Sequence, residues 1–149
     1  MCNMELAQFL PYRLSILSNV VSNAISEYYA DRFNLSISGW RVMALLAQKP
    51  RSTAVDIASM TQMDKVAISR AVASLVQMEY IAREPCTVDR RRTYLTLTKK
   101  GTDIYNDIVP VAQSYEDKLV ASLSETKRKQ LDNLLAELQC NANTLTKQL

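Results

Sequence analysis

Near the start of the chain, hydrophobic positions recur at helical spacing. Between Leu10 and Arg32 the apolar side chains are alternately four and three residues apart, which indicates one face of an α-helix. Pro11 suits the first turn of this helix, where its missing N–H costs nothing. Additional apolar residues widen the stripe, so we expect the helix to be covered on two sides. The stripe consists of Leu10, Leu14, Leu17, Val21, Ala24 and Tyr28, widened by Ile16, Val20 and Ile25.

Three shorter helices are predicted next, each with its own start signal. Ser36 is a good N-cap for a helix over residues 37–48, which ends before a proline. Thr53, followed three residues later by an aspartate, resembles a capping box and opens a short second helix. Asp64 caps the third helix, over residues 65–78. Its apolar face consists of Ile68, Val72, Leu75 and Val76.

After Tyr80 the pattern changes to β-branched and alternating residues. Residues 80–83 and 93–97 read as two strands, and the polar, charged segment 85–92 between them reads as a hairpin tip. Thr98 then caps a long helix over residues 99–122, in which Pro110 predicts a kink. A last helix follows. Its apolar positions are Leu131, Leu134, Leu135, Leu138, Ala142, Leu145 and Leu149.

The fold class that follows is mostly α with a small β-hairpin. The second and third short helices, joined by the break at Thr61–Met63, form a helix-turn-helix pattern, and a basic hairpin directly after it makes a winged helix-turn-helix. We assign residues 34–101 to this DNA-binding domain. Residues 1–33 and 102–149 form a helical dimerisation region, because a second copy is the simplest cover for their apolar stripes. A monomeric helical bundle is the alternative.

The composition excludes many kinds of chemistry. The 149 residues contain no histidine, two distant glycines and three scattered cysteines. Zinc sites with histidine and nucleophile–histidine arrangements are therefore absent, as are a Walker A loop and a dinucleotide fingerprint. No pair of cysteines has the spacing of a redox or zinc motif. We expect no enzyme, cofactor or metal, although an enzyme using tyrosine and carboxylates is a distant alternative.

The net charge of +3 is unevenly distributed. Residues 49–100 carry ten basic and five acidic side chains, a net of +5, whereas the rest carry eight and ten, a net of −2. Such a local basic segment is typical of nucleic-acid contact, although a solvated basic surface is the alternative. The first ten residues carry no basic residue, so no secretory signal is expected. Unpaired cysteines without an export signal indicate the cytoplasm.

The third short helix is the expected recognition helix, which enters the major groove. If its apolar face is buried, then Val66, Ala67, Arg70, Ala71 and Ser74 point outward. Arg70 is the best candidate for a base edge, because arginine bound to guanine is the commonest specific contact. Lys65 and Ser69 suit phosphates, and outward apolar residues suit thymine methyl groups. A surface salt bridge is the alternative role for Arg70.

The predicted hairpin tip carries three consecutive arginines. Because like charges repel, a merely structural turn would rarely contain Arg90, Arg91 and Arg92 together. Asp89 is placed to pair with Arg91 and aim it, which leaves its two neighbours for phosphates. A narrow minor groove attracts arginine through its negative potential. A solvated loop is the alternative.

These motifs together resemble the MarR (multiple-antibiotic-resistance) regulators over about residues 8–145. Residues 64–70, DKVAISR, are similar to the recognition-helix motif D-K-x-x-V-S-R. Residues 89–91 and 95–101 look like the D-x-R wing and the L-T-x-x-G junction. The resemblance implies a homodimer that binds a pseudo-palindromic operator, represses neighbouring genes and is released by a small aromatic, acid-like ligand. The sequence departs from the family where Gln62 and Glu79 replace usual glycines.

A ligand site and two other roles complete the predictions. A cation on an otherwise apolar helix side needs a partner, either an internal carboxylate or a ligand carboxylate, so we expect an aromatic acid in a cleft. Redox sensing through Cys86 in the wing is an alternative switch, with Cys2 and Cys140 less favourably placed. A protein-interaction module is the alternative to DNA binding. The predicted ligand residues are Arg13, Tyr12, Trp40, Arg41 and Met43.

Overall fold

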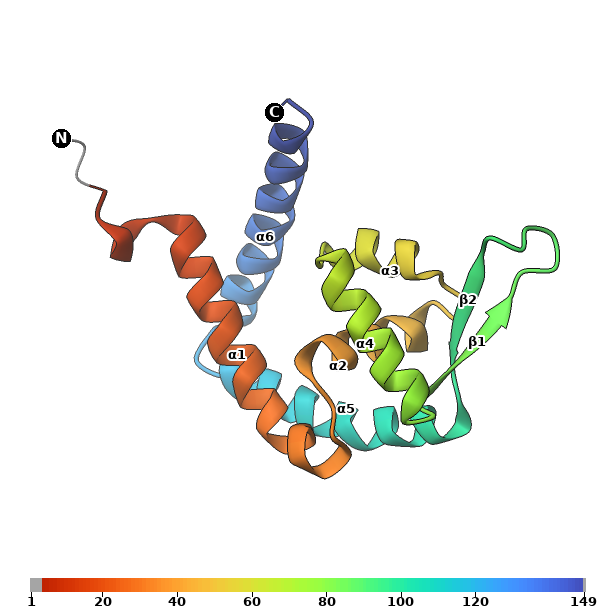
Figure 1. Ribbon diagram of the computed structural model, residues 1–149. Coiled ribbons are helices and arrows are strands. Elements are labelled where there is room, and N and C mark those ends of the chain that lie inside the picture. The colour runs from red at the N-terminus through yellow and green to blue at the C-terminus, as the bar shows by residue number, and fades with distance from the viewer. Residues whose placement is uncertain (1–3, 149) are drawn as a thin grey trace. The chain divides into compact units, whose positions relative to one another are not determined.

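The computed structural model describes residues 4–148 and consists of helices with one β-hairpin (Figure 1). The chain divides into two compact units, one up to Ala112 and one from Gln113 on. No helix in the described part is long and apolar enough to cross a membrane. In order, the elements are a 3-10 turn (Leu6–Gln8), α1 (Leu10–Phe33), α2 (Ile37–Gln48), α3 (Ala54–Thr61), α4 (Lys65–Gln77), β1 (Ile81–Pro85), β2 (Thr93–Leu97), α5 (Lys99–Leu119) and α6 (Glu125–Thr146). The predicted fold class is confirmed.

The helices begin at the residues whose side chains can cap them. The Ser36 hydroxyl accepts the N–H of Gly39 at 2.9 Å. Thr53 and Asp56 form a complete capping box, in which each side chain bonds the other's backbone N–H. One carboxylate oxygen of Asp64 accepts two N–H groups of the first turn of α4. These bonds satisfy N–H groups that have no partner within the helix, so the predicted starts are confirmed.

Two helices end in a left-handed residue at the positions where the resembling family has glycine. Gln62, after α3, has a φ of 54°, and Glu79, after α4, has a φ of 61°. At the end of α4 the N–H of Tyr80 bonds the carbonyl of Leu75 at 2.9 Å, and the N–H of Glu79 bonds that of Val76 at 3.0 Å. This pair of bonds is a Schellman motif. The backbone therefore keeps the turn geometry although the glycine is missing.

The core of the first unit lies where α2, α3 and α4 pack together beside the hairpin (Figure 1). α5 starts against this core, because a Cβ on Gly101 would lie 1.9 Å from the carbonyl oxygen of Tyr80. Only glycine permits this approach, which fixes the start of α5 beside the end of α4. The fully buried larger side chains are Tyr29, Val42, Met43, Leu46, Ile57, Ile68, Leu75, Ile81 and Ile108.

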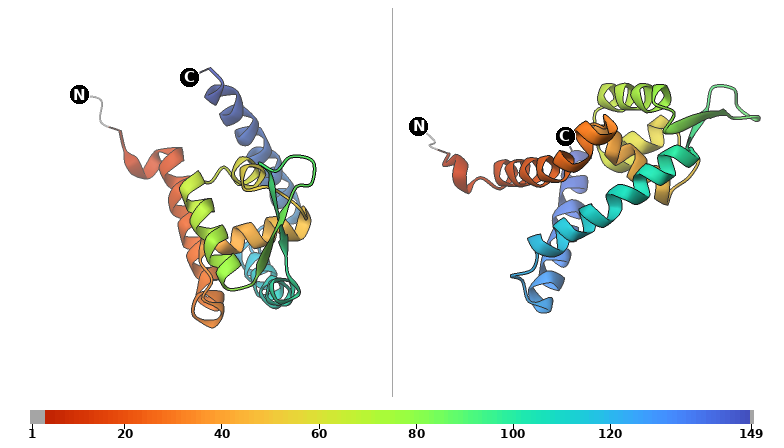
Figure 2. Two further views of the ribbon diagram at one scale, coloured as in Figure 1. Left: turned by 45° about the vertical axis from the view of Figure 1, so that its right-hand side comes forward. Right: turned by 90° about the horizontal axis from the view of Figure 1, so that it is seen from below.

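β1 and β2 form an antiparallel hairpin with Ile81 opposite Leu97 and Pro85 opposite Thr93. Its base is anchored by buried Ile81 and Leu95, and Leu95 also donates its N–H to Ser52 in the α2–α3 loop. The right-hand view of Figure 2 shows the hairpin tip extending beyond the helices of its unit. Some boundaries differ from the predictions. β1 begins at Ile81 and continues to Pro85, which was expected in the tip, and α5 ends at Leu119 after continuing through Pro110.

Two helices expose apolar side chains within a single chain. In α1, all residues from Leu10 to Val20 are exposed, including Leu17 at 56%. In the second unit, α6 starts at the Ser124 cap and exposes every described residue. The exposed leucines of α6 are Leu131, Leu134, Leu135, Leu138 and Leu145. Burial of apolar surface is the main stabilising force in folding, so these faces are incomplete in an isolated chain.

Candidate nucleic-acid interface

Helix α4 has one buried face and one open, polar face. Lys65, Val66, Ser69, Arg70 and Ser74 are exposed, as predicted for a recognition helix, and Ala67 is half-buried. The prediction that Ala71 points outward is wrong, because its side chain is only 4% exposed. Residue 71 follows Ile68 by three positions and precedes Leu75 by four, which places it on the same helical stripe.

The guanidinium of Arg70 is open to an external partner. No carboxylate within the described residues lies within 4.0 Å of it, so the salt bridge considered from the sequence is not formed there. Arg70 lines a shallow depression with Ser74 and with Ser36 and Ser38 from the start of α2. No sequence pattern marks these two serines, because only the packing of α2 against α4 brings them beside Arg70.

The tip of the wing is a tight turn fixed by Asp89. The N–H of Arg92 bonds the Asp89 carbonyl at 3.0 Å, and the N–H of Arg91 bonds the Asp89 carboxylate at 3.0 Å. We expected this carboxylate to hold the Arg91 side chain, but it holds the Arg91 backbone, since a turn brings the N–H two residues on within its reach. The three guanidinium groups of residues 90–92 remain exposed.

The wing and the start of α3 form a notch that carries both charge signs. Arg91 and Arg92 line it together with Thr53 and Asp56. The pKa of the Asp56 carboxyl is lowered mainly by the hydrogen bonds that Thr53 donates, with a smaller contribution from the positive charge of Arg92. Asp56 is thus ionised at neutral pH, and the wing arginines outnumber the carboxylates beside them.

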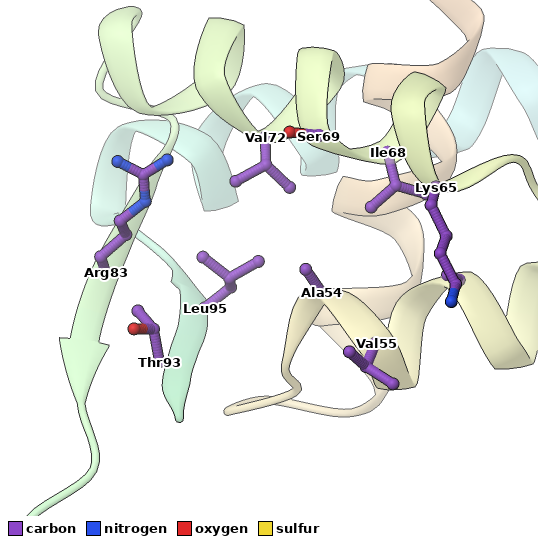
Figure 3. A pocket seen from close by; sticks show the side chains of 10 residues that line it. Ala54, Val55, Lys65, Ile68, Ser69, Val72, Arg83, Thr93 and Leu95 are labelled. Atoms are coloured by element: carbon purple, nitrogen blue, oxygen red, sulfur yellow. The ribbon is translucent and has the colours of Figure 1, made fainter. Parts of the chain in front are cut away.

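A groove of about 290 Å³ separates α4 from the wing (Figure 3). Val72 and Leu95 face each other across it, whereas Lys65 and Arg83 stand at opposite ends. A mostly apolar recess with two cations at its edges suits a small molecule that combines a ring with a negative charge. The groove is formed by residues of α3, α4 and both strands.

The predicted ligand residues do not gather in one place within a chain. Tyr12 and Arg13 are exposed in the first turns of α1, and Met43 is completely buried in the core. Arg41 donates to the Ser22 hydroxyl at 3.0 Å. Ser22 follows Arg13 by nine residues, which corresponds to about 13 Å along a helix.

Trp40 is enclosed by other aromatic side chains. Its ring lies 5.5 Å from that of Tyr105 in a stacked arrangement and 5.8 Å from that of Tyr29. Burial raises the pKa of Tyr29 to about 12, although the positive charge of Arg41 opposes this shift. This cluster packs α2 between α1 and α5 and leaves part of Trp40 exposed.

The cysteines differ in their surroundings. Hydrogen bonds from the backbone N–H groups of Asp89 and Val88 lower the pKa of the Cys86 thiol, and the first of these bonds measures 3.4 Å. Cys140 is exposed on α6. Cys2 lies outside the described residues.

An exposed cationic helix beside an arginine-tipped hairpin defines a winged helix-turn-helix protein of the nucleic-acid-binding class. Comparison with known proteins supports this class. Residues 33–92 match the sequence model described as the MarR family. The HTH-type transcriptional regulator BilQ from Clostridium symbiosum is 31% identical over 93 residues. That match covers 62% of this chain and 65% of BilQ, just under two thirds of its length.

Solved structures share the fold over nearly the whole chain. A MarR/EmrR family transcriptional regulator from Acinetobacter sp. ADP1 matches with a TM-score of 0.86 and 23% identity, over 95% of this chain and 99% of that one. BpsR from Bordetella bronchiseptica, whose DNA binding is regulated by 6-hydroxynicotinic acid, matches with a TM-score of 0.79 and 19% identity, over 92% and 97%. Residues 33–92 are thus similar to the MarR family, and nearly the whole chain shares the fold of solved transcriptional regulators of that family.

Proposed function

We propose that the protein binds duplex DNA as a homodimer, with α4 in the major groove and the wing over the adjacent minor groove. The observation that carries this proposal is the exposed guanidinium of Arg70 on α4, beside three exposed arginines at the wing tip. Lys65 and Ser69 are placed for phosphates, and Val66 and Ala67 for thymine methyl groups. Ser74 and Asp89 complete the interface, the latter by holding the tip.

The second copy is proposed to cover the apolar faces of α1 and α6. Residues 1–33 and 102–149 would then supply the dimer, and residues 34–101 the DNA-binding domain. Two-fold symmetry would place the recognition helices about 34–36 Å apart, one turn of DNA, on a pseudo-palindromic operator. The uncovered leucines of both helices support this arrangement, because water-exposed apolar stripes of such length are unfavourable.

Selection of duplexes from a random pool, followed by binding measurements at several salt concentrations, tests DNA binding. Arg70→Ala should cost about 1–3 kcal/mol and relax the preference at one base pair, because a base contact is lost. Arg91→Ala should reduce the slope of log affinity against log salt by about one unit. Lys129→Ala, which removes an exposed cation paired with Glu125 on α6, is the control. If both variants bind like the control, a protein-interaction module becomes the better interpretation.

The regulator is proposed to act in the cytoplasm as a repressor of neighbouring genes that a small aromatic acid releases. BpsR, which has the same fold, supports a ligand of this kind. The predicted site comprises Arg13, Tyr12, Trp40, Arg41 and the buried Met43. The groove between Lys65 and Arg83 offers the same chemistry. Titration of a DNA complex with benzoate, cinnamate and 6-hydroxynicotinate tests the proposal. If a compound releases the DNA and Arg13→Ala abolishes this release, the predicted site is supported. If Arg83→Ala abolishes it, the groove is supported. If no compound releases the DNA, both sites are refuted.

Redox control through Cys86 is the second candidate, favoured by the lowered pKa of its thiol at the base of the wing tip. A larger thiolate fraction reacts faster with oxidants. Peroxide should then weaken DNA binding by the wild type but not by Cys86→Ser. Equal affinity of treated and untreated wild type would exclude this switch.

A further inference from the structure

Arg51, in the loop between α2 and α3, contacts both strands of the wing. Its Nη2 lies 3.3 Å from Oε1 of Glu84 on β1. Its guanidinium also lies over the ring of Tyr94 on β2, 5.0 Å from the centroid. Glu84 and Tyr94 are directly opposite each other in the hairpin register. One side chain therefore holds the two strands at the same level.

This level is where the hairpin leaves the body of its unit. Ser52, the next residue in the loop, accepts the N–H of Leu95 at 2.9 Å and is itself buried. Beyond Glu84 and Tyr94 only one further residue pair, Pro85 and Thr93, precedes the arginine tip. A rotation of the strands at this level would displace the tip, so a contact here sets the direction in which the arginines point.

The backbone of Arg51 has an unfavourable conformation at this position. Its φ of 60° is in the left-handed region, which glycine adopts more readily. The turn lets Ser52 bond Lys49 and Leu95, and its left-handed position is occupied by arginine and not by glycine. Arginine suits the contacts, because its planar guanidinium can both face a carboxylate and lie on an aromatic ring.

We infer that Arg51 is a positioning residue that orients the wing for DNA. This inference rests on the proposed function, since it assumes that the wing tip touches DNA. The opposing interpretation is that Arg51, whose side chain is 58% exposed, binds a phosphate itself. The two interpretations predict opposite effects for Glu84. If Arg51 binds phosphate, then removing the Glu84 carboxylate frees Arg51 and strengthens DNA binding. If Arg51 positions the wing, then removing that carboxylate loosens the wing and weakens DNA binding.

The experiment compares Arg51→Gly and Glu84→Gln with wild type on the selected operator duplex. Glycine removes the anchor while relieving the left-handed backbone, so the thermal stability should be retained. Each variant should weaken binding about three- to tenfold, because an exposed ion pair and a cation–π contact each correspond to a few-fold change in an equilibrium. Hydroxyl-radical cleavage should show lost protection of the minor groove under the wing and retained protection under α4.

Arg32→Ala is the matched control. Arg32 pairs with Asp107 at 3.8 Å, with the same side-chain exposures of 58% and 48%, and lies over the ring of Tyr28. This pair joins α1 to α5, away from the wing. Because α1 and α5 belong to the proposed dimerisation region, any effect of this loss acts on the wing and on α4 alike. The ratio of protection under the wing to protection under α4 should therefore stay unchanged.

The tip-neutralised variant Arg90→Ala/Arg91→Ala/Arg92→Ala separates failure of this inference from failure of the proposed function. In that background Arg51→Gly should cause no further loss, because the tip that it orients is gone. Stronger or unchanged DNA binding by Glu84→Gln would overturn the positioning role. So would a loss of affinity from Arg51→Gly that adds in full to the loss from the tip variant. If the tip variant and Arg70→Ala both bind normally, DNA binding through this face is itself wrong.

Discussion

The left-handed residue after the recognition helix permits a quantitative test of how this chain forms its helix ends. Glu79 has a φ of 61°, its side chain is exposed, and its backbone forms the Schellman motif with Val76. The carbonyl of Glu79 also accepts the Thr98 hydroxyl at 2.7 Å. Every one of these bonds involves backbone atoms of Glu79, so Glu79→Gly keeps them all. It removes the unfavourable Cβ together with an exposed carboxylate that forms no ion pair among the described residues.

The magnitude follows from two opposing contributions. A left-handed conformation costs a non-glycine residue about 1–2 kcal/mol. Glycine is more flexible in the unfolded chain, which costs about 0.5–1 kcal/mol on folding. We therefore expect Glu79→Gly to raise the free energy of unfolding by up to about 1.5 kcal/mol, with a central value of about 0.75 kcal/mol.

Gln62→Gly is the informative comparison, because Gln62 has nearly the same φ of 54°. Its side-chain amide, however, donates to the carbonyl of Ser59 at 2.6 Å. Glycine loses this hydrogen bond, which is worth about 0.5–1.5 kcal/mol. Relief of strain and loss of the bond offset each other, so Gln62→Gly should leave the stability nearly unchanged.

Urea unfolding followed by circular dichroism, at one fixed protein concentration, measures both effects. The fixed concentration matters because the stability of a dimer depends on it. The slope of free energy against urea should be the same for all three proteins, since the surface exposed on unfolding is the same. Destabilisation by Glu79→Gly, or equal gains from both variants, would refute the argument that backbone strain and a side-chain bond decide these turns.

Three further predictions concern charge, assembly and thiol chemistry. The lowered pKa of Asp56 contributes stability that is present above the ordinary aspartate pKa and lost as the pH falls through the lowered value, so Asp56→Asn should flatten the acid limb of a stability–pH curve. Leu17→Glu should shift the protein from dimer to monomer in sedimentation, because it places charge in the proposed interface, whereas Asn23→Glu at another exposed α1 position should not. Cys86 should react with iodoacetamide at a lower pH than a free cysteine does, as a stopped-time alkylation series would show.

The sequence was most informative where a residue acts on its neighbours. The caps at Ser36, Thr53 and Asp64 depend on side chains and N–H groups within three residues, and all three form as expected. The change from helical spacing to alternation after Tyr80 located the start of β1 to within one residue, and β2 at its observed bounds. Local signals of this kind need no knowledge of the rest of the fold.

Features that depend on packing between distant segments were missed. Nothing in the sequence relates Arg51 to Glu84 and Tyr94, because an ion pair between residues far apart in the chain leaves no periodic pattern. The outward placement of Ala71 failed for a related reason, since alanine is tolerated on either face of a helix. Asp89 was correctly connected with Arg91, but the choice between its backbone and its side chain depends on the turn geometry.

Tyr80 connects three of the helices, α1, α4 and α5. Its hydroxyl donates to the carbonyl of Phe33 at the end of α1, at 2.8 Å, and its own carbonyl accepts the N–H of Thr98 at 3.0 Å. The same carbonyl lies against Gly101, and its N–H closes the end of α4. The ends of α1 and α4 and the start of α5 thus meet at one residue. Because close-packed groups cannot move independently, a displacement of α1 or α5, both of which have most of their length in the proposed dimerisation region, is transmitted to the end of α4.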